Sequence, residues 1–104
     1  MNPVIEAHRD QMHRLCRQFG VERLDVFGSA AGASFDPQRS DIDFVVDFGA
    51  DLFSRYFGLN EALAQLFGRK VDLVMVGGMV NPYFIEAVNR TRQSVYARPV
   101  AEAA

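Results

Sequence analysis

The sequence predicts an α/β (α+β) fold whose elements follow the order αβ(α)βαβα. Short runs of β-branched and aromatic residues alternate with longer segments in which apolar residues recur every three or four positions. Glycines stand where several of these segments end. The 104 residues are 49% hydrophobic and 12% aromatic, which is enough to fill one core. We therefore expect a single domain over residues 1–104.

The first expected element is a helix from Pro3 to Phe19. Proline suits the first turn of a helix, and Gly20 stands where a C-terminal cap would lie. The apolar positions recur at helical spacing: Val4, Ile5, Met12, Leu15, Cys16 and Phe19. The single cysteine, Cys16, lies on this helix, so we expect a buried and unreactive thiol.

Two strands follow, separated by a polar loop. Residues 21–27, VERLDVF, are typical of a strand that enters a tight turn at Gly28. Residues 29–40 predict a loop with one short helical turn. The second strand, residues 41–48, places Ile42, Phe44, Val46 and Phe48 on one face and Asp41, Asp43, Val45 and Asp47 on the other. Asp25 and Asp47 are expected to be surface residues.

The second half of the chain predicts a helix over residues 52–67, a strand over residues 71–76 and a last helix from Asn81 to Arg92. Gly68 ends the first of these elements, and the paired glycines after residue 76 form a loop. Val95 and Tyr96 finish the ordered chain, and residues 99–104 form a frayed tail. We interpret the aromatic residues Phe53, Tyr56, Phe57 and Phe67 as core, with an interface as the alternative for any surplus.

Composition narrows the classes of function. The net charge of -2 and the 23% of charged residues argue against disorder and against a chain that coats nucleic acid. The N-terminus lacks the apolar run of a signal peptide, and no stretch is long and apolar enough to span a membrane. We therefore expect a cytoplasmic protein that binds neither membranes nor nucleic acid directly.

Three aspartates form the candidate catalytic and metal site. Asp41 and Asp43 lie on one face of a strand with their Cα atoms about 6.6 Å apart. Asp72 opens a later apolar strand, and it comes within reach of the pair if the two strands are neighbours. Like charges about 4 Å apart repel by about 4 kcal/mol at an effective dielectric of about 20. The cluster therefore calls for a cation, and clustered carboxylates favour Mg²⁺.

A candidate phosphate site lies upstream. Gly28 and Ser29 follow the first strand at a turn, where glycine allows backbone N–H groups to approach a phosphate and the serine hydroxyl adds a donor. A Gly-Ser pair alone is weak evidence. The order Gly-Ser, polar loop, Asp-x-Asp and a later strand aspartate is much more specific.

This order resembles the minimal nucleotidyltransferases (MNT proteins) of the DNA polymerase beta superfamily. Gly28-Ser29 is followed by the residues 30–40, then by Asp41-Ile42-Asp43, with Asp72 in RKVDLV. The resemblance extends over nearly the whole chain and implies a polymerase-beta-like fold, a small mixed sheet backed by helices. It also implies that Asp41, Asp43 and Asp72 hold two Mg²⁺ ions and that Gly28 and Ser29 bind the triphosphate of ATP.

The resemblance further implies a function. Small members transfer AMP to a tyrosine of a helical HEPN-type toxin and so act as antitoxins. Many members also have an arginine shortly after the Gly-Ser pair, whereas this chain has only small residues there. Arg39, Arg69 or Lys70 are the candidates to replace its charge. The alternative is a catalytically weakened module that neutralises or scaffolds a partner by binding alone. The acceptor, the nucleotide and the oligomeric state stay open.

Overall fold

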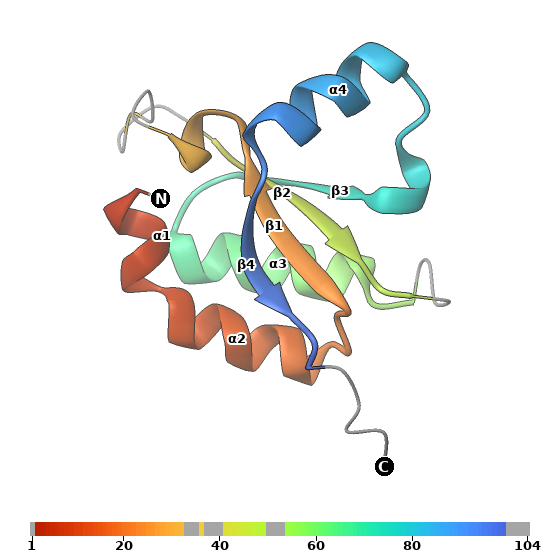
Figure 1. Ribbon diagram of the computed structural model, residues 1–104. Helices are drawn as coiled ribbons and strands as arrows, with labels where there is room; N and C mark the ends of the chain where they lie inside the picture. Colours follow the sequence, from red (N-terminus) through yellow and green to blue (C-terminus); the bar gives the residue numbers. More distant parts are fainter. Residues whose placement is uncertain (1, 33–35, 37–40, 50–53, 100–104) are drawn as a thin grey trace.

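The computed structural model describes residues 2–32, 36, 41–49 and 54–99. Helices and strands alternate in it, as Figure 1 shows. The elements are α1 (Pro3–Ala7), α2 (Arg9–Gln18), β1 (Arg23–Phe27), the 3-10 turn η1 (Gly28–Ala31), β2 (Ile42–Asp47), α3 (Tyr56–Phe67), β3 (Val71–Met75), the 3-10 turn η2 (Val76–Gly78), α4 (Pro82–Thr91) and β4 (Gln93–Ala97). No helix in these segments is long and apolar enough to cross a membrane.

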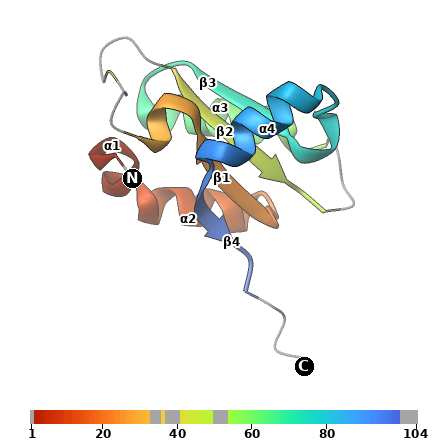
Figure 2. The same ribbon diagram turned by 45° about the horizontal axis from the view of Figure 1, so that its top comes forward.

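Four strands form one mixed sheet in the order β3-β2-β1-β4. β1 is antiparallel to both β2 and β4, whereas β2 and β3 are parallel and are connected through α3. Figures 1 and 2 show α2 and α3 on one face of this sheet and α4 on the other. The predicted mixed sheet backed by helices is therefore confirmed.

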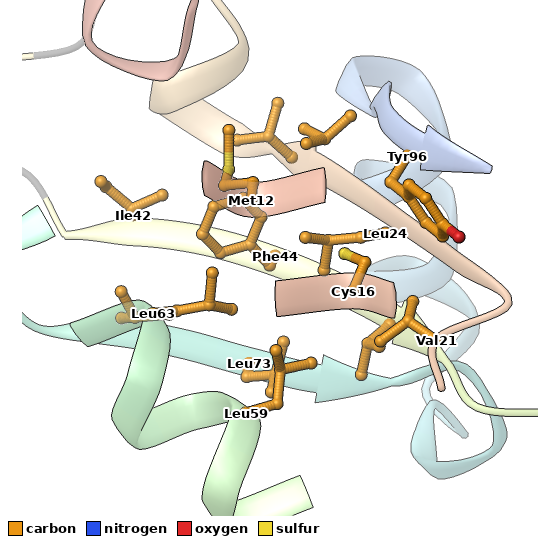
Figure 3. Packing of buried hydrophobic residues seen from close by; sticks show 14 of the residues in the cluster. Met12, Cys16, Val21, Leu24, Ile42, Phe44, Leu59, Leu63, Leu73 and Tyr96 are labelled. Atoms are coloured by element: carbon orange, nitrogen blue, oxygen red, sulfur yellow. The ribbon is translucent and has the colours of Figure 1, made fainter. Parts of the chain in front are cut away.

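The main core lies between the sheet and the pair α2 and α3. Met12 and Cys16 of α2 and Leu63 of α3 pack there against Ile42 and Phe44 of β2, and all five are fully buried (Figure 3). Cys16 is fully buried as expected, and burial raises the pKa of its thiol to about 12. On the opposite face, a small second cluster joins Phe27, Val45 and Val88 beneath α4.

Two predicted elements need correction. The first helix is split into α1 and α2 at His8, whose ring nitrogen Nδ1 lies 2.8 Å from the Val4 carbonyl oxygen and whose ring packs on Phe67. The chain also ends in a fourth strand, β4, which the sequence analysis did not predict. Its five residues, QSVYA, include only Val95 and Tyr96 as buried residues, so they carry no alternating pattern.

Asp25 is the third correction, because it is fully buried and not a surface residue. Its carboxylate accepts from Nε of Arg92 at 2.7 Å and from Nε of Arg23 at 3.0 Å. Burial of a charge requires such partners. Here the partners come from β1 itself and from the residue that follows α4, so the position of Arg92 was beyond a local reading of the sequence.

The aromatic residues of α3 divide between the two interpretations. Tyr56 and Phe67 pack against the main core, but Phe57 is 77% exposed, so the core interpretation is wrong for this residue. Phe53 lies outside the described residues, as do residues 100–104 of the expected tail.

Candidate active site

The sheet topology brings the predicted site residues together at one end of the neighbouring strands β1, β2 and β3. Because β1 and β2 are antiparallel, the end of β1 lies beside the start of β2, and Phe27 is the register partner of Asp43. Because β2 and β3 are parallel, their starts are also adjacent, and Asp43 is the register partner of Asp72. Strand neighbours lie about 4.8 Å apart, so the third carboxylate joins the first pair as expected.

The carboxylate cluster is electrostatically unfavourable without a cation. Burial, the adjacent Asp72 carboxyl and the charge of Asp41 together raise the pKa of Asp43 to about 6. Lys70 acts in the opposite direction on this pKa. Asp43 is half-buried, while the side chains of Asp41 and Asp72 are 44% and 47% exposed. The cluster is thus open to solvent on one side.

Lys70 is the basic residue that the structure brings to this cluster. Its Nζ lies 3.8 Å from Oδ2 of Asp41 and 3.8 Å from Oδ1 of Asp72, and the side chain is 70% exposed. Of the three candidates for a replacement charge, Arg39 lies outside the described residues. Arg69 is partly buried and its Nε is enclosed. Lys70 is therefore a candidate whose contacts with the carboxylates are seen among the described residues.

The turn after β1 is shaped by the absence of a side chain at Gly28. This residue has a positive φ of 68°, and a Cβ atom built on it would lie 2.9 Å from Oδ2 of Asp43. Glycine is thus needed for both the turn and the approach of the carboxylate. The Gly28 N–H donates to Oγ1 of Thr91 at 2.9 Å. Ser29 follows in η1 and is partly exposed.

Thr91 was missed by the sequence analysis. It lies 63 residues from Gly28 in the chain, at the end of α4, and no local pattern connects the two positions. Only the return of the chain from α4 into β4 brings this hydroxyl beside the turn, since β4 pairs with β1.

The donor set fits a hard divalent cation in its chemistry. Three carboxylates, from β2, from β3 and from the residue before β2, offer oxygen ligands, and their mutual repulsion is relieved by positive charge. In the part of the chain that the structure describes, no three Asp, Glu, His or Cys side chains are already drawn together tightly enough to enclose an ion. The carboxylates are thus adjacent but not closed around one point.

A cleft of about 870 Å³ opens between α3 and α4 along the β3 edge of the sheet. Asp43 and Asp72 line it together with Phe57 and Asn60 of α3 and Phe84 of α4. The carboxylates therefore face a space large enough for substrate groups, and aromatic side chains flank that space.

Comparison with known proteins agrees with this geometry. The family model described as "Nucleotidyltransferase domain" matches residues 9–99. A candidate protein adenylyltransferase of Methanocaldococcus jannaschii, MJ0128, is 35% identical over 75 residues, which cover 71% of this chain and 76% of that protein. Protein adenylyltransferase MntA of Thermococcus cleftensis is 34% identical over 73 residues, covering 69% of this chain and 70% of the relative.

Solved structures show the same fold. A candidate minimal nucleotidyltransferase superposes with a TM-score of 0.71 at 32% identity, covering 85% of this chain and 89% of the other. An MNT antitoxin in complex with a tri-AMPylated HEPN toxin of Shewanella oneidensis gives a TM-score of 0.65 at 19% identity, over 90% and 73% of the two chains. At that identity the second likeness concerns the fold alone. The chain belongs to the nucleotidyltransferase domain family and, within it, to the minimal nucleotidyltransferases with a polymerase-beta-like fold.

Proposed function

We propose that this nucleotidyltransferase transfers AMP from ATP to a hydroxyl group of a partner protein in the cytoplasm, in a Mg²⁺-dependent reaction. The convergence of Asp41, Asp43 and Asp72 with the Gly28-Ser29 turn at one edge of the sheet carries this proposal. Relatives at 34% and 35% identity carry the name protein adenylyltransferase, one of them as a candidate, which supports AMP as the transferred group.

The carboxylates take the metal-binding role in this proposal. Asp41 and Asp43 of the β2 edge and Asp72 of β3 would hold Mg²⁺, as two ions by the resemblance to MNT proteins. Bound Mg²⁺ supplies positive charge to the phosphates and to the developing negative charge during transfer. A nearby cation favours the charged form of Asp43, against the burial and the neighbouring carboxyl groups that raise its pKa.

The residues of this site account for each part of the proposed transfer. The hydroxyl oxygen of the acceptor attacks the α-phosphorus of ATP, and the bond from that phosphorus to the bridging oxygen of the β-phosphate breaks. Pyrophosphate leaves, and the hydroxyl proton passes to the Asp72 carboxylate. Ser29 donates to the triphosphate, while Gly28 leaves room for the Asp43 carboxylate beside it. Lys70 adds positive charge beside Asp41 and Asp72 and is our candidate to replace the arginine that the chain lacks after Gly28-Ser29.

We infer that the acceptor is a helical HEPN-type toxin and that this chain is its antitoxin. The MNT antitoxin of similar fold is found in complex with such a toxin in AMPylated form. Large apolar side chains are exposed on this chain, as expected for a surface that binds a protein: Phe57, which lines the cleft, at 77%, Val80 at 86% and Tyr83 at 82%. The chain itself is acidic overall, with a net charge of -2.

A second candidate function is neutralisation of the partner by binding alone. The specific observation in its favour is the lack of an arginine after Gly28-Ser29, because this weakens the grip on the triphosphate. In that case Asp43→Asn leaves toxin neutralisation intact. In the catalytic case the same substitution abolishes it.

The test is co-expression with a HEPN-type protein, taken from a neighbouring reading frame if one is encoded there, followed by intact-mass measurement of that partner. We expect a partner heavier by one or more AMP groups with the wild type, and an unmodified partner with Asp43→Asn. Asp47→Asn is the matched control, since Asp47 lies on the same strand and bonds the Gly49 N–H at 2.8 Å, away from the site. A partner that binds but never gains mass would favour neutralisation by binding.

A further inference from the structure

We propose that Thr91 is a positioning residue for the Gly28-Ser29 turn and that it raises the affinity for the nucleotide without contacting it. This inference rests on the proposed function, since it assigns a role within the same site. The hydrogen bond from the Gly28 N–H to Oγ1 of Thr91 carries it.

The Thr91 hydroxyl is held in one orientation. Its hydrogen is donated to the carbonyl oxygen of Ala87, one turn earlier in α4, at 3.3 Å. A lone pair of the same oxygen therefore points away from its own helix and accepts from Gly28 at 2.9 Å. Threonine connects the end of α4 with the turn through one atom.

The end of α4 is itself fixed to the sheet. The next residue, Arg92, donates its backbone N–H to the Val88 carbonyl at 2.8 Å, and its side chain binds the fully buried Asp25 carboxylate at 2.7 Å. Val88 is fully buried against Phe27 and Val45. Thr91 thus lies between two anchored residues, Val88 and Arg92, so the position of its hydroxyl is fixed relative to the sheet.

The attachment bears directly on the site. With its N–H bound to Thr91, the peptide group between Phe27 and Gly28 has a fixed plane, since a peptide bond does not rotate. Gly28 at a φ of 68° then directs the chain toward Ser29 and lies against the Asp43 carboxylate. In this structure the Gly28 N–H is bonded to Thr91, so the Ser29 hydroxyl is the donor of the turn that we assign to the triphosphate. Release of this bond loosens the turn at the point where Ser29 meets the triphosphate.

Loss of the Thr91 hydroxyl should change the position of the Gly28-Ser29 turn more than it lowers the stability of the fold. The Gly28 N–H lies at the surface, where water can replace the lost acceptor. Water does not fix the peptide plane as Thr91 does. Thr91→Val preserves shape and β-branching but removes the acceptor, whereas Thr91→Ser keeps it. Arg90→Ala is the control, because Arg90 is the exposed neighbour on α4 and its ion pair with Glu86 is long and exposed, at 3.7 Å.

The first measurement is hydrogen exchange of the Gly28 amide by NMR, which does not require nucleotide. We expect exchange about tenfold faster in Thr91→Val than in the wild type, Thr91→Ser or Arg90→Ala, as follows from loss of a typical hydrogen bond. The second is titration with Mg²⁺ and ATP, for which we expect about fivefold weaker binding in Thr91→Val alone. In transfer assays the KM for ATP should rise more than kcat falls.

Unchanged Gly28 exchange in Thr91→Val would overturn the inference, and so would a Thr91→Ser protein that behaves like Thr91→Val. Failure of the proposed function looks different, since the wild type itself would then bind no nucleotide. That result would refute the positioning role together with the function, even if the exchange data confirmed the contact.

Discussion

Replacement of Gly28 by alanine should impair nucleotide transfer far more than it impairs folding. Gly28 has a φ of 68°, and an added Cβ would lie 2.9 Å from Oδ2 of Asp43. Gly68 provides a matched control: it has a φ of 63°, and a Cβ there meets nothing within 4 Å. The two positions share the backbone conformation and differ in what the new methyl group touches.

The backbone cost of the two substitutions should be nearly equal. A residue with a side chain in the left-handed region costs about 1–2 kcal/mol. The loss of freedom in the unfolded chain on going from glycine to alanine is common to both variants and cancels. We therefore expect both proteins to lose about 1–2 kcal/mol of unfolding free energy in urea denaturation.

Gly28→Ala and Gly68→Ala should differ in their rate of AMP transfer. In Gly28→Ala the obstacle is the tip of a flexible side chain, so the carboxylate can move aside at little cost in stability. It then leaves the position in which we propose that it binds the cation. We expect transfer of AMP to fall at least about tenfold, equivalent to about 1.4 kcal/mol in activation free energy, while Gly68→Ala keeps wild-type activity. Equal transfer by the two variants would refute the argument.

Three further predictions concern charged residues. Because the pKa of Asp43 is raised to about 6, its carboxyl group binds a proton more tightly in the folded than in the unfolded state. The metal-free protein should therefore lose stability as the pH rises from about 4 to about 6. Asp43→Asn should remove this part of the pH dependence of the unfolding free energy in urea denaturation, and identical pH profiles for the variant and the wild type would contradict the prediction. Calorimetry should show that Lys70→Met binds Mg²⁺ about two- to threefold more tightly than the wild type, because the ammonium group 3.8 Å from Asp41 no longer competes with the ion. Weaker binding by the variant would contradict this and show that Lys70 supports the metal site. Arg92→Met should cost about 3 kcal/mol of unfolding free energy, because it leaves the buried Asp25 carboxylate with the half-exposed Arg23 as its partner. Arg23→Met should cost about 1 kcal/mol or less. Similar losses for the two variants would contradict the view that the Arg92–Asp25 ion pair is the buried one.

Much of the site was predictable because its signals are local. The alternation in residues 41–48 assigned Asp43 to one face and Phe44 to the core, and the structure confirms both. The placement of Asp72 beside Asp43 needed one assumption, that the two strands are neighbours, and this is confirmed by their parallel pairing. The alternating pattern of the strand and the order of the motifs were therefore enough to predict where the carboxylates lie, although their roles as metal ligands and catalytic residues stay predictions.

What the sequence did not reveal depends on contacts between distant segments. Asp25 has the same local pattern as a surface strand residue, and its burial depends on Arg92, 67 residues away, in addition to the nearby Arg23. Thr91 meets Gly28 for the same reason, since β4 returns beside β1. β4 is stabilised by pairing with β1 and by Val95 and Tyr96 in the main core, but its five residues carry too few apolar positions to predict a strand.

The exposure of Phe57 was ambiguous for a different reason. An apolar residue on an amphipathic helix is usually buried, and the core face of α3 already contains Leu59 and Leu63. Phe57 lies off that face, beside the cleft. A local pattern can show that a helix has a surplus of aromatic residues, but it cannot show which of them the core leaves outside.

The most direct measurement of the central claim uses ATP labelled either on the α-phosphate or on the γ-phosphate. The purified protein is incubated with Mg²⁺, its helical partner and one of the two labelled nucleotides, with Asp43→Asn and metal-free reactions as controls. Transfer of AMP predicts that the partner acquires the α-label and never the γ-label, and that both controls abolish labelling. Acquisition of the γ-label, or equal α-labelling by Asp43→Asn, would contradict the proposed reaction.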